Sequence, residues 1–117
     1  MDLYNKTFID LFAGIGGFHQ ALSSFGAKCV FVSEIDKYAR DTYFANYGIV
    51  PVGDITIIHE NTIPKHDILC AGFPCQAFSI AGKQKIIFYI VRIVNYHHPS
   101  LILLKNVKNL GNVVCHC

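Results

Sequence analysis

The sequence predicts an α/β fold, a doubly wound parallel sheet with right-handed crossover helices. Short apolar runs rich in β-branched residues alternate with longer segments whose apolar residues recur at helical spacing. Glycine and proline residues separate many of these segments. Because ligands of such sheets bind at the carboxyl ends of the strands, polar residues that follow each predicted strand are candidates for a binding site.

The first half of the chain contains two strand–helix units. Residues 7–12 form the first predicted strand, and a glycine-rich turn leads from it into a helix over residues 18–25. Residues 29–33 are rich in β-branched and aromatic side chains and form the second strand. Asp36 can cap a second helix that runs to about Asn46.

The second half contains the remaining strands and one helix. Its most apolar segment, residues 86–94, is interrupted by Arg92 and is much shorter than the roughly 20 residues of a membrane-spanning helix. We therefore expect a buried helix and no membrane association. The predicted elements are a brief third strand at 50–52, a fourth at 67–71, a turn over 72–82, a helix over 85–96 and a fifth strand at 101–104.

Composition favours one compact domain, or a piece of one, over residues 1–117. The chain is 52% hydrophobic and 15% charged, which excludes a disordered protein. Its net charge of +2 is compatible with a nucleic-acid partner but lacks the dense Lys/Arg footprint of a dedicated DNA-binding module. The N-terminus has no secretory signal pattern, so we expect a cytoplasmic location and five cysteines present as thiols.

A glycine-rich turn follows the first predicted strand. It departs from the G-x-G-x-x-G pattern of dinucleotide-binding folds and is a weak signal by itself. Glycines let the backbone approach a ligand, and amides at a helix N-terminus can hold an anionic group such as a carboxylate. A tight turn packed for its own sake is the alternative. The turn reads Phe12-Ala13-Gly14-Ile15-Gly16-Gly17.

Acidic residues follow the second and third predicted strands. Glu34 stands 20 residues after Gly14, where an acidic side chain in such folds accepts hydrogen bonds from the hydroxyls of a ribose. Asp54 supplies another acceptor at the same rim, suited to the exocyclic amine of adenine. Ile35 and Ile55 offer apolar faces to the ring. Each acid could instead be a solvated loop residue or a helix cap.

A more specific motif, Gly-Phe-Pro-Cys-Gln-Ala-Phe-Ser, occupies residues 72–79. With Phe12–Gly17, Glu34 and residues 53–55 in this order, the chain resembles the S-adenosylmethionine-dependent DNA cytosine-5 methyltransferases, particularly the bacterial restriction-modification type. The resemblance runs almost unbroken over residues 7–85. It implies a Rossmann-like sheet of the class I methyltransferase type, S-adenosyl-L-methionine as cofactor and double-stranded DNA as partner, with the target cytosine flipped out of the helix.

The resemblance also implies residue roles. Cys75 would be the nucleophile, because a thiolate added at C6 of cytosine turns C5 into a carbon that can attack a methyl group. Pro74 pre-sets the turn that holds this cysteine outward, whereas Cys29 and Cys70 lie in apolar strands as inert thiols. No metal ligands are implied. The cofactor contacts would be Phe12, Ala13, Gly14, Gly16, Gly17, Glu34, Ile35, Asp54, Ile55, Gly72, Pro74 and Ile86.

The chain departs from the family pattern in two places. Lys85 leads directly into Ile86, where the family has a mobile loop that closes over the flipped base, so closure should be impaired. Lys105 stands where the family has a glutamate. Because an ammonium group has three donors and no acceptor, it cannot act as that carboxyl group does.

The resemblance fades after Asn109, before the later strands and the target recognition domain of the family. We therefore expect a sheet truncated after about five strands, an exposed apolar edge at residues 101–104 and no turnover by the isolated chain. A complementary chain could carry the missing motifs. A non-catalytic S-adenosylmethionine-binding module and a non-functional gene remnant are the alternatives. Residues 115–117, Cys-His-Cys, lack the second ligand pair of a structural zinc site.

Overall fold

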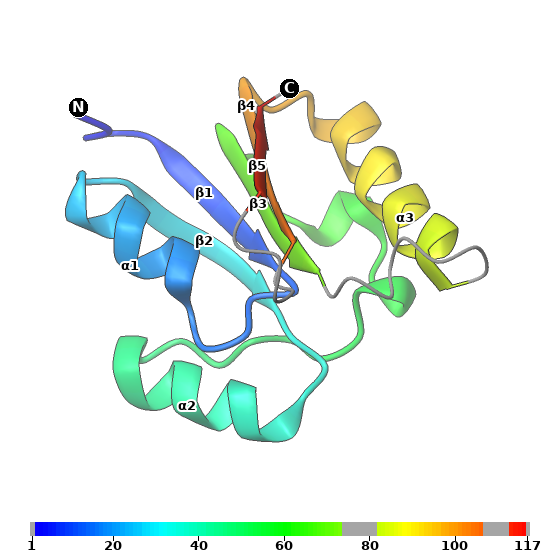
Figure 1. The fold of residues 1–117 in the computed structure, drawn as a ribbon. Helices are drawn as coiled ribbons and strands as arrows, with labels where there is room; N and C mark the ends of the chain where they lie inside the picture. The colour runs from blue at the N-terminus through cyan, green and yellow to red at the C-terminus, as the bar shows by residue number, and fades with distance from the viewer. Residues whose placement is uncertain (1, 74–81, 107–112, 117) are drawn as a thin grey trace.

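The computed structural model describes residues 2–73, 82–106 and 113–116, which build a sheet flanked by helices on both faces (Figure 1). The predicted alternation of strands and helices is confirmed. In chain order the elements are β1 (Thr7–Leu11), α1 (Gly17–Ser24), β2 (Lys28–Ser33), α2 (Lys37–Tyr47), the 3-10 helices η1 (Ile55–Ile57) and η2 (Glu60–Thr62), β3 (Ile68–Phe73), α3 (Gly82–His97), β4 (Leu101–Asn106) and β5 (Val113–His116).

The strands lie in the order β2-β1-β3-β4-β5. β1 pairs in parallel with β2 and β3, and β3 pairs in parallel with β4. The chain thus runs outward from β1 to β2 and then crosses to the other side of β1. This reversal of strand order is the point at which open α/β sheets bind their ligands.

The third predicted strand, at residues 50–52, is reduced to a single parallel bridge between Val52 and Ser33. The Val52 amide donates to the Val32 carbonyl, and the Val52 carbonyl accepts from the Glu34 amide, both at 2.9 Å. Pro51 has no N–H group and cannot contribute a donor to the ladder. The segment therefore lies beside β2, where a third strand would lie, without forming one.

The expected exposed edge at residues 101–104 is wrong in part. β5 pairs antiparallel with β4, from Leu103 opposite His116 to Asn106 opposite Val113. Backbone hydrogen bonding to β5 therefore covers the second half of β4. β5 could not be predicted from the sequence because the strand has only four residues and follows no recognisable helix.

Side chains of β1 alternate between the two faces of the sheet. Phe8 packs on the face covered by α1, whereas Ile9 and Leu11 pack on the face covered by α3 and the 3-10 helices (Figure 1). The first face is completed by Leu22, Ala27, Ile68 and Cys70, and the second by Ile55, Ile63, Leu69, Ala71, Ile90 and Ile93.

The helix α3 is amphipathic, which corrects the prediction of a buried helix. Ile90 and Ile93 are buried, but Phe88 and Val91 remain 63% and 47% exposed. Arg92 forms an ion pair of 3.3 Å with Glu60 of η2. Among the described helices, none combines the length and the apolar character that crossing a membrane would require.

Candidate cofactor-binding site

A cavity of about 710 Å³ opens where the strand order reverses. This volume is typical of small-molecule sites. The cavity receives residues from the segments that follow β1 and β2, from the region of Val52, and from β3, α3 and β4. Its lining consists of Phe12, Ala13, Gly14, Ile15, Gly17, Phe18, Ser33, Glu34, Ile35, Gly53, Asp54, Ile55, Thr56, Gly72, Ile86 and Lys105.

Hydrogen bonds tie the loops around the cavity to one another. The Ala13 amide donates to the Ser33 carbonyl at 3.1 Å, which joins the loop after β1 to the end of β2. The Ser33 hydroxyl donates to the Gly53 carbonyl, also at 3.1 Å. These contacts hold three loops in fixed positions before any ligand arrives, so less ordering entropy is lost on binding.

Glu34 is oriented by two backbone amides. Its Oε1 accepts from the Gly14 amide at 2.7 Å, and its Oε2 accepts from the Asp36 amide at 2.8 Å. Each carboxylate oxygen retains a second lone pair for a ligand hydroxyl. Arg40, which the sequence analysis did not single out, donates to the carbonyl of Glu34 at 3.1 Å and also to that of Ile35. The α2 helix thus fixes the acidic loop.

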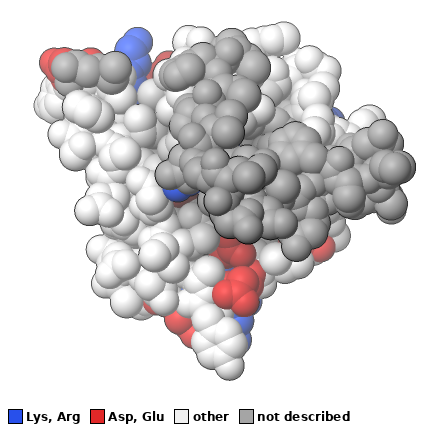
Figure 2. Space-filling model, in the orientation of Figure 1, with Lys and Arg blue, Asp and Glu red and all other residues white. Residues whose placement is uncertain are grey.

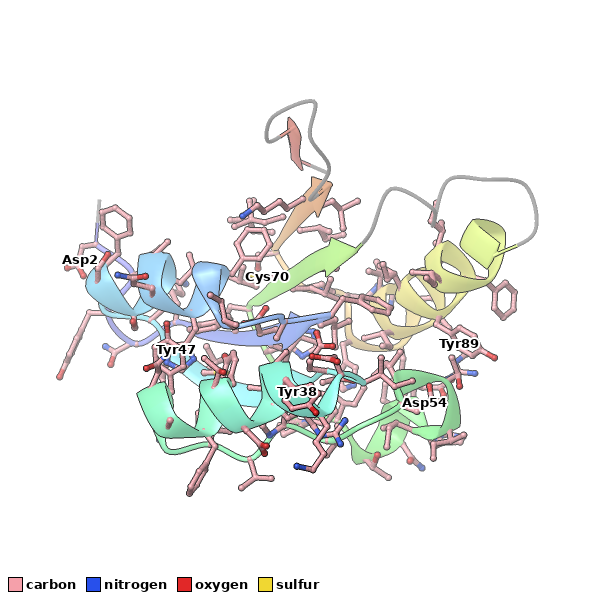
Figure 3. The ribbon with its side chains drawn as sticks, turned by 60° about the horizontal axis from the view of Figure 1, so that its bottom comes forward. Asp2, Tyr38, Tyr47, Asp54, Cys70 and Tyr89 are labelled. Carbon is pink, nitrogen blue, oxygen red and sulfur yellow. The ribbon has the colours of Figure 1, made fainter. Side chains whose placement is uncertain are left out.

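Asp54 both lines the cavity and caps η1. Its two predicted places, at the rim of the site and at a helix cap, are therefore compatible. Its Oδ1 accepts from the Thr56 amide at 2.9 Å and from the Thr56 hydroxyl at 2.7 Å. These hydrogen bonds lower the pKa of Asp54, the hydroxyl contributing most. Figure 3 shows Asp54 beside the 3-10 segment, outside the helix α2. The group is therefore ionised at neutral pH.

The glycine turn serves both the cavity and the interior. Gly14 and Gly17 are among the residues that line the cavity, and Gly16 is not. Gly16 has φ +100°, and a Cβ built on it would lie 2.4 Å from Cε2 of Tyr47. The Tyr47 hydroxyl donates to the Gly16 carbonyl at 3.0 Å. Gly16 is required because the turn packs directly against a ring of α2.

A buried polar network lies behind this turn. The Tyr43 hydroxyl donates to Oδ2 of Asp10 at 3.0 Å and lies 2.7 Å from Nδ1 of His19. Burial raises the pKa of Asp10 to about 7, although the Tyr43 hydrogen bond opposes the rise. Burial also lowers the pKa of His19. Because the Tyr43 hydroxyl donates its proton to Asp10, it must accept in its hydrogen bond with His19. A neutral His19 that is protonated on Nδ1 provides this donor.

The same histidine connects the first two helices. Its ring stacks on Tyr47 with a centroid distance of 3.9 Å and meets Phe8 edge-on at 5.5 Å. Figure 3 shows Tyr47 on the side of α2 that faces α1. The only signal of this network in the sequence is an aspartate within the apolar run of residues 7–12, which by itself does not identify its partners.

Two of the five cysteines have described side chains. Cys70 is fully buried in β3, in the middle of the sheet in Figure 3, and burial raises its thiol pKa. Cys29 is half-buried, and burial raises its pKa to about 11. Both fit the expected inert thiols. Pro74 and Cys75 lie outside the described residues, as do the side chains at 115–117; among the rest, no cluster suits a metal ion.

The remaining expected contacts reach the cavity from several elements. Ile35 is 69% exposed at its rim, whereas Ile55 is buried. Gly72 near the end of β3 and Ile86 on α3 also line the cavity. Lys105 joins them from β4, with its Nζ 3.8 Å from where a Cβ on Gly17 would lie.

The fold is that of methyltransferases. A prophage-encoded E. coli protein assigned as a DNA modification methyltransferase superposes with a TM-score of 0.76 and 25% identity, over 91% of this chain and 33% of that one. The Dnmt2 methyltransferase of S. pombe gives a TM-score of 0.71 at 19% identity, over 91% of this chain and 35% of its own.

The sequence profile of the C-5 cytosine-specific DNA methylases matches residues 6–113, and the chain belongs to this family. It is 56% identical over 113 residues to the type II methyltransferase M.HhaI of Haemophilus parahaemolyticus, covering 90% of this chain and 35% of that protein. It is 53% identical over 116 residues to M.HpaII of Haemophilus parainfluenzae, covering 91% and 32%. The chain thus spans about a third of the length of these relatives.

Proposed function

We propose that the cavity binds S-adenosyl-L-methionine and that this chain is the N-terminal part of the catalytic domain of a DNA (cytosine-5-)-methyltransferase. The observation that carries the proposal is the Glu34 carboxylate, held at 2.7 Å by the Gly14 amide of the glycine turn. An acid at the end of the second strand, fixed against the turn after the first, is the arrangement that receives a ribose in α/β nucleotide sites.

The remaining residues fit the other parts of this cofactor. Oδ2 of Asp54 can accept from the adenine amine, because Oδ1 is engaged by Thr56. Ile35 and Ile55 supply apolar surface for the ring. The amides at the start of α1, near Gly17, suit the carboxylate of the amino-acid moiety. The cavity is large enough for the whole molecule.

The cofactor would supply an electrophilic methyl group to the reaction. In this proposal the Cys75 thiolate attacks C6 of a flipped cytosine, which makes C5 nucleophilic. The described cysteines are poor candidates for this role because burial raises the pKa of both Cys29 and Cys70. Assigning the nucleophile to Cys75 therefore rests on the family resemblance and on the exclusion of these two thiols. The reaction would take place in the cytoplasm.

A second candidate function is S-adenosylmethionine binding without turnover by this chain alone. Lys105 lines the cavity where the family resemblance implies a glutamate, and an ammonium cannot accept a hydrogen bond from the cytosine amine. Figure 2 shows Lys and Arg scattered singly over the described part of one face, not as a continuous basic surface for DNA. A complementary chain with the remaining motifs would then be required for methylation.

Calorimetry and methyl transfer separate these candidates. Titration of S-adenosyl-L-methionine into folded protein should release or absorb heat at one site per chain. Transfer of a tritiated methyl group to mixed-sequence DNA, compared with a Cys75→Ser variant, then reports activity. Label that depends on Cys75 supports the enzyme, binding without label supports the second candidate, and the absence of binding by folded protein rejects both.

A further inference from the structure

Lys105 brings a positive charge into the cavity at the end opposite the two acids. It belongs to β4, and its neighbour in the parallel register is Gly72 of β3. Glu34 follows β2, and two strands, β1 and β3, lie between β2 and β4. At about 4.8 Å per strand, the backbones of β2 and β4 are roughly 14 Å apart.

No acidic side chain among the described residues forms an ion pair with Lys105; the pairs found involve Asp41 and Glu60, away from the cavity. The Lys105 ammonium instead lies near the start of α1, 3.8 Å from a Cβ built on Gly17. The positive end of the helix dipole adds to the same potential. The half-buried position of Lys105 leaves this charge less screened than a surface lysine.

We infer that Lys105 selects the charge of the bound cofactor and favours the neutral thioether, S-adenosyl-L-homocysteine, over the sulfonium S-adenosyl-L-methionine. This rests on the proposed cofactor site. With the ribose hydroxyls on Glu34, the sulfur, which is bonded to the ribose C5′, extends from the acidic end toward β3 and β4. The two ligands differ by one methyl group and one positive charge, so the ratio of their affinities reports the potential at the sulfur.

The magnitude follows from Coulomb's law. Two like charges at the separations available in this cavity, with an effective dielectric constant between protein and water, change an affinity roughly five- to tenfold. Removing the Lys105 charge should therefore lower the preference for the thioether by this factor. A carboxylate at the same position should lower it further, because it attracts the sulfonium.

The test is calorimetric titration of both ligands into wild-type protein, Lys105→Gln, Lys105→Glu and the control Lys28→Gln. Lys28 is exposed at the opposite end of β2, so its variant has the same change in net charge outside the cavity. We expect the affinity ratio to fall roughly five- to tenfold in Lys105→Gln, to fall further in Lys105→Glu and to stay constant in Lys28→Gln. A ratio unchanged in the Lys105 variants overturns this inference but leaves the proposed cofactor site intact.

Wild-type protein provides a second readout that does not depend on a variant folding. Salt screens the repulsion between the half-buried ammonium and the sulfonium only in part, so between 50 and 500 mM NaCl S-adenosyl-L-methionine should gain affinity relative to the thioether by roughly twofold, less than in the Lys105 variants. A ratio independent of salt, together with unchanged ratios in the variants, contradicts the inference. If folded wild-type protein binds neither ligand, the proposed cofactor site itself is wrong and the inference is wrong with it.

Discussion

The Oε1 atom of Glu34 accepts a hydrogen bond of 2.7 Å from the amide of Gly14, a residue 20 positions earlier in the chain. This contact joins the loop after β1 to the loop after β2 at the mouth of the cavity. It also uses an amide that the tight turn would otherwise leave without an intramolecular acceptor. The acidic residue is therefore both a structural clamp of the rim and the proposed ribose acceptor.

Replacement of Glu34 by Gln should weaken cofactor binding. The amide nitrogen of Gln cannot accept a hydrogen bond, so either the Gly14 or the Asp36 amide loses its partner. We expect affinity to fall about 10- to 100-fold, consistent with the loss of one or two charge-assisted hydrogen bonds. Titration calorimetry measures this change. An exposed carboxylate, Asp41, gives the control Asp41→Asn, which should bind as wild type does. Equal affinities for all three proteins would exclude Glu34 from the site.

Replacement of Gly16 by Ala should destabilise the protein strongly. The new Cβ would lie 2.4 Å from Tyr47 Cε2 at φ +100°, and that ring is held by its hydrogen bond and by stacking on His19. We expect a loss of about 3 kcal/mol in the free energy of unfolding. In the control Gly48→Ala, φ is +72° with no atom within 4 Å, so the loss should be about 1 kcal/mol.

Urea denaturation followed by circular dichroism measures both values. The difference between the two variants isolates the clash from the backbone strain that they share. If Gly16→Ala is no less stable than Gly48→Ala, the turn does not pack against α2 as described. Any loss of stability measured in Gly16→Ala would then be due to backbone strain alone.

Replacement of Asp10 by Asn should remove a component of the pH dependence of stability. The folded protein raises the pKa of Asp10 from 3.8 to about 7, so between these values the folded state binds more protons than the unfolded state. Stability therefore falls as pH rises through this window. Asn cannot titrate, but its carbonyl can still accept from Tyr43.

The measured quantity is the free energy of unfolding of wild type minus that of Asp10→Asn, at pH 5 and pH 8. Subtraction removes the opposite contributions of His19 and His66, whose pKa values are lowered. We expect this difference in the free energy of unfolding to be smaller at pH 8 than at pH 5 by on the order of 2–4 kcal/mol. A constant difference would show that Asp10 is ionised at both pH values.

Cys75 should be the most reactive of the three cysteines in the first 80 residues. Burial protects Cys70 and raises the thiol pKa of both Cys29 and Cys70, so neither is a good nucleophile at neutral pH. A brief pulse of iodoacetamide at pH 7.5, followed by peptide mass spectrometry, should label Cys75 first. The control is urea-unfolded protein, in which all three should react alike. Preferential labelling of Cys70 in folded protein would contradict the assignment.

Much of this site could be predicted from the sequence because its residues follow strands in a regular way. Glu34 and Asp54 were identified from their places at strand ends, and the structure brings both to one cavity. The prediction of a third strand was wrong because Pro51 has no N–H group to donate to the ladder and only Val52 forms a bridge to β2. Side-chain contacts between helices, such as Tyr47 with the glycine turn, depend on packing that no local pattern records.

The buried polar network around Asp10 also depends on contacts that the local sequence pattern does not record. An aspartate in an apolar strand was visible in the sequence, but its partners come from two different helices, His19 from α1 and Tyr43 from α2. Likewise, Lys105 could be recognised as a departure from the family pattern, whereas its position beside Gly17 depends on the order of β1, β3 and β4 in the sheet.

The most direct test of the central claim, that the cavity at the strand ends is the cofactor site, is amide NMR of ¹⁵N-labelled protein during titration with S-adenosyl-L-homocysteine. The account predicts that the amides of Gly14, Glu34 and Thr56 shift together and saturate with one dissociation constant, while those of Lys28 and Thr7 at the opposite ends of β2 and β1 do not. Saturable shifts elsewhere, with these three amides unmoved in folded protein, would contradict it.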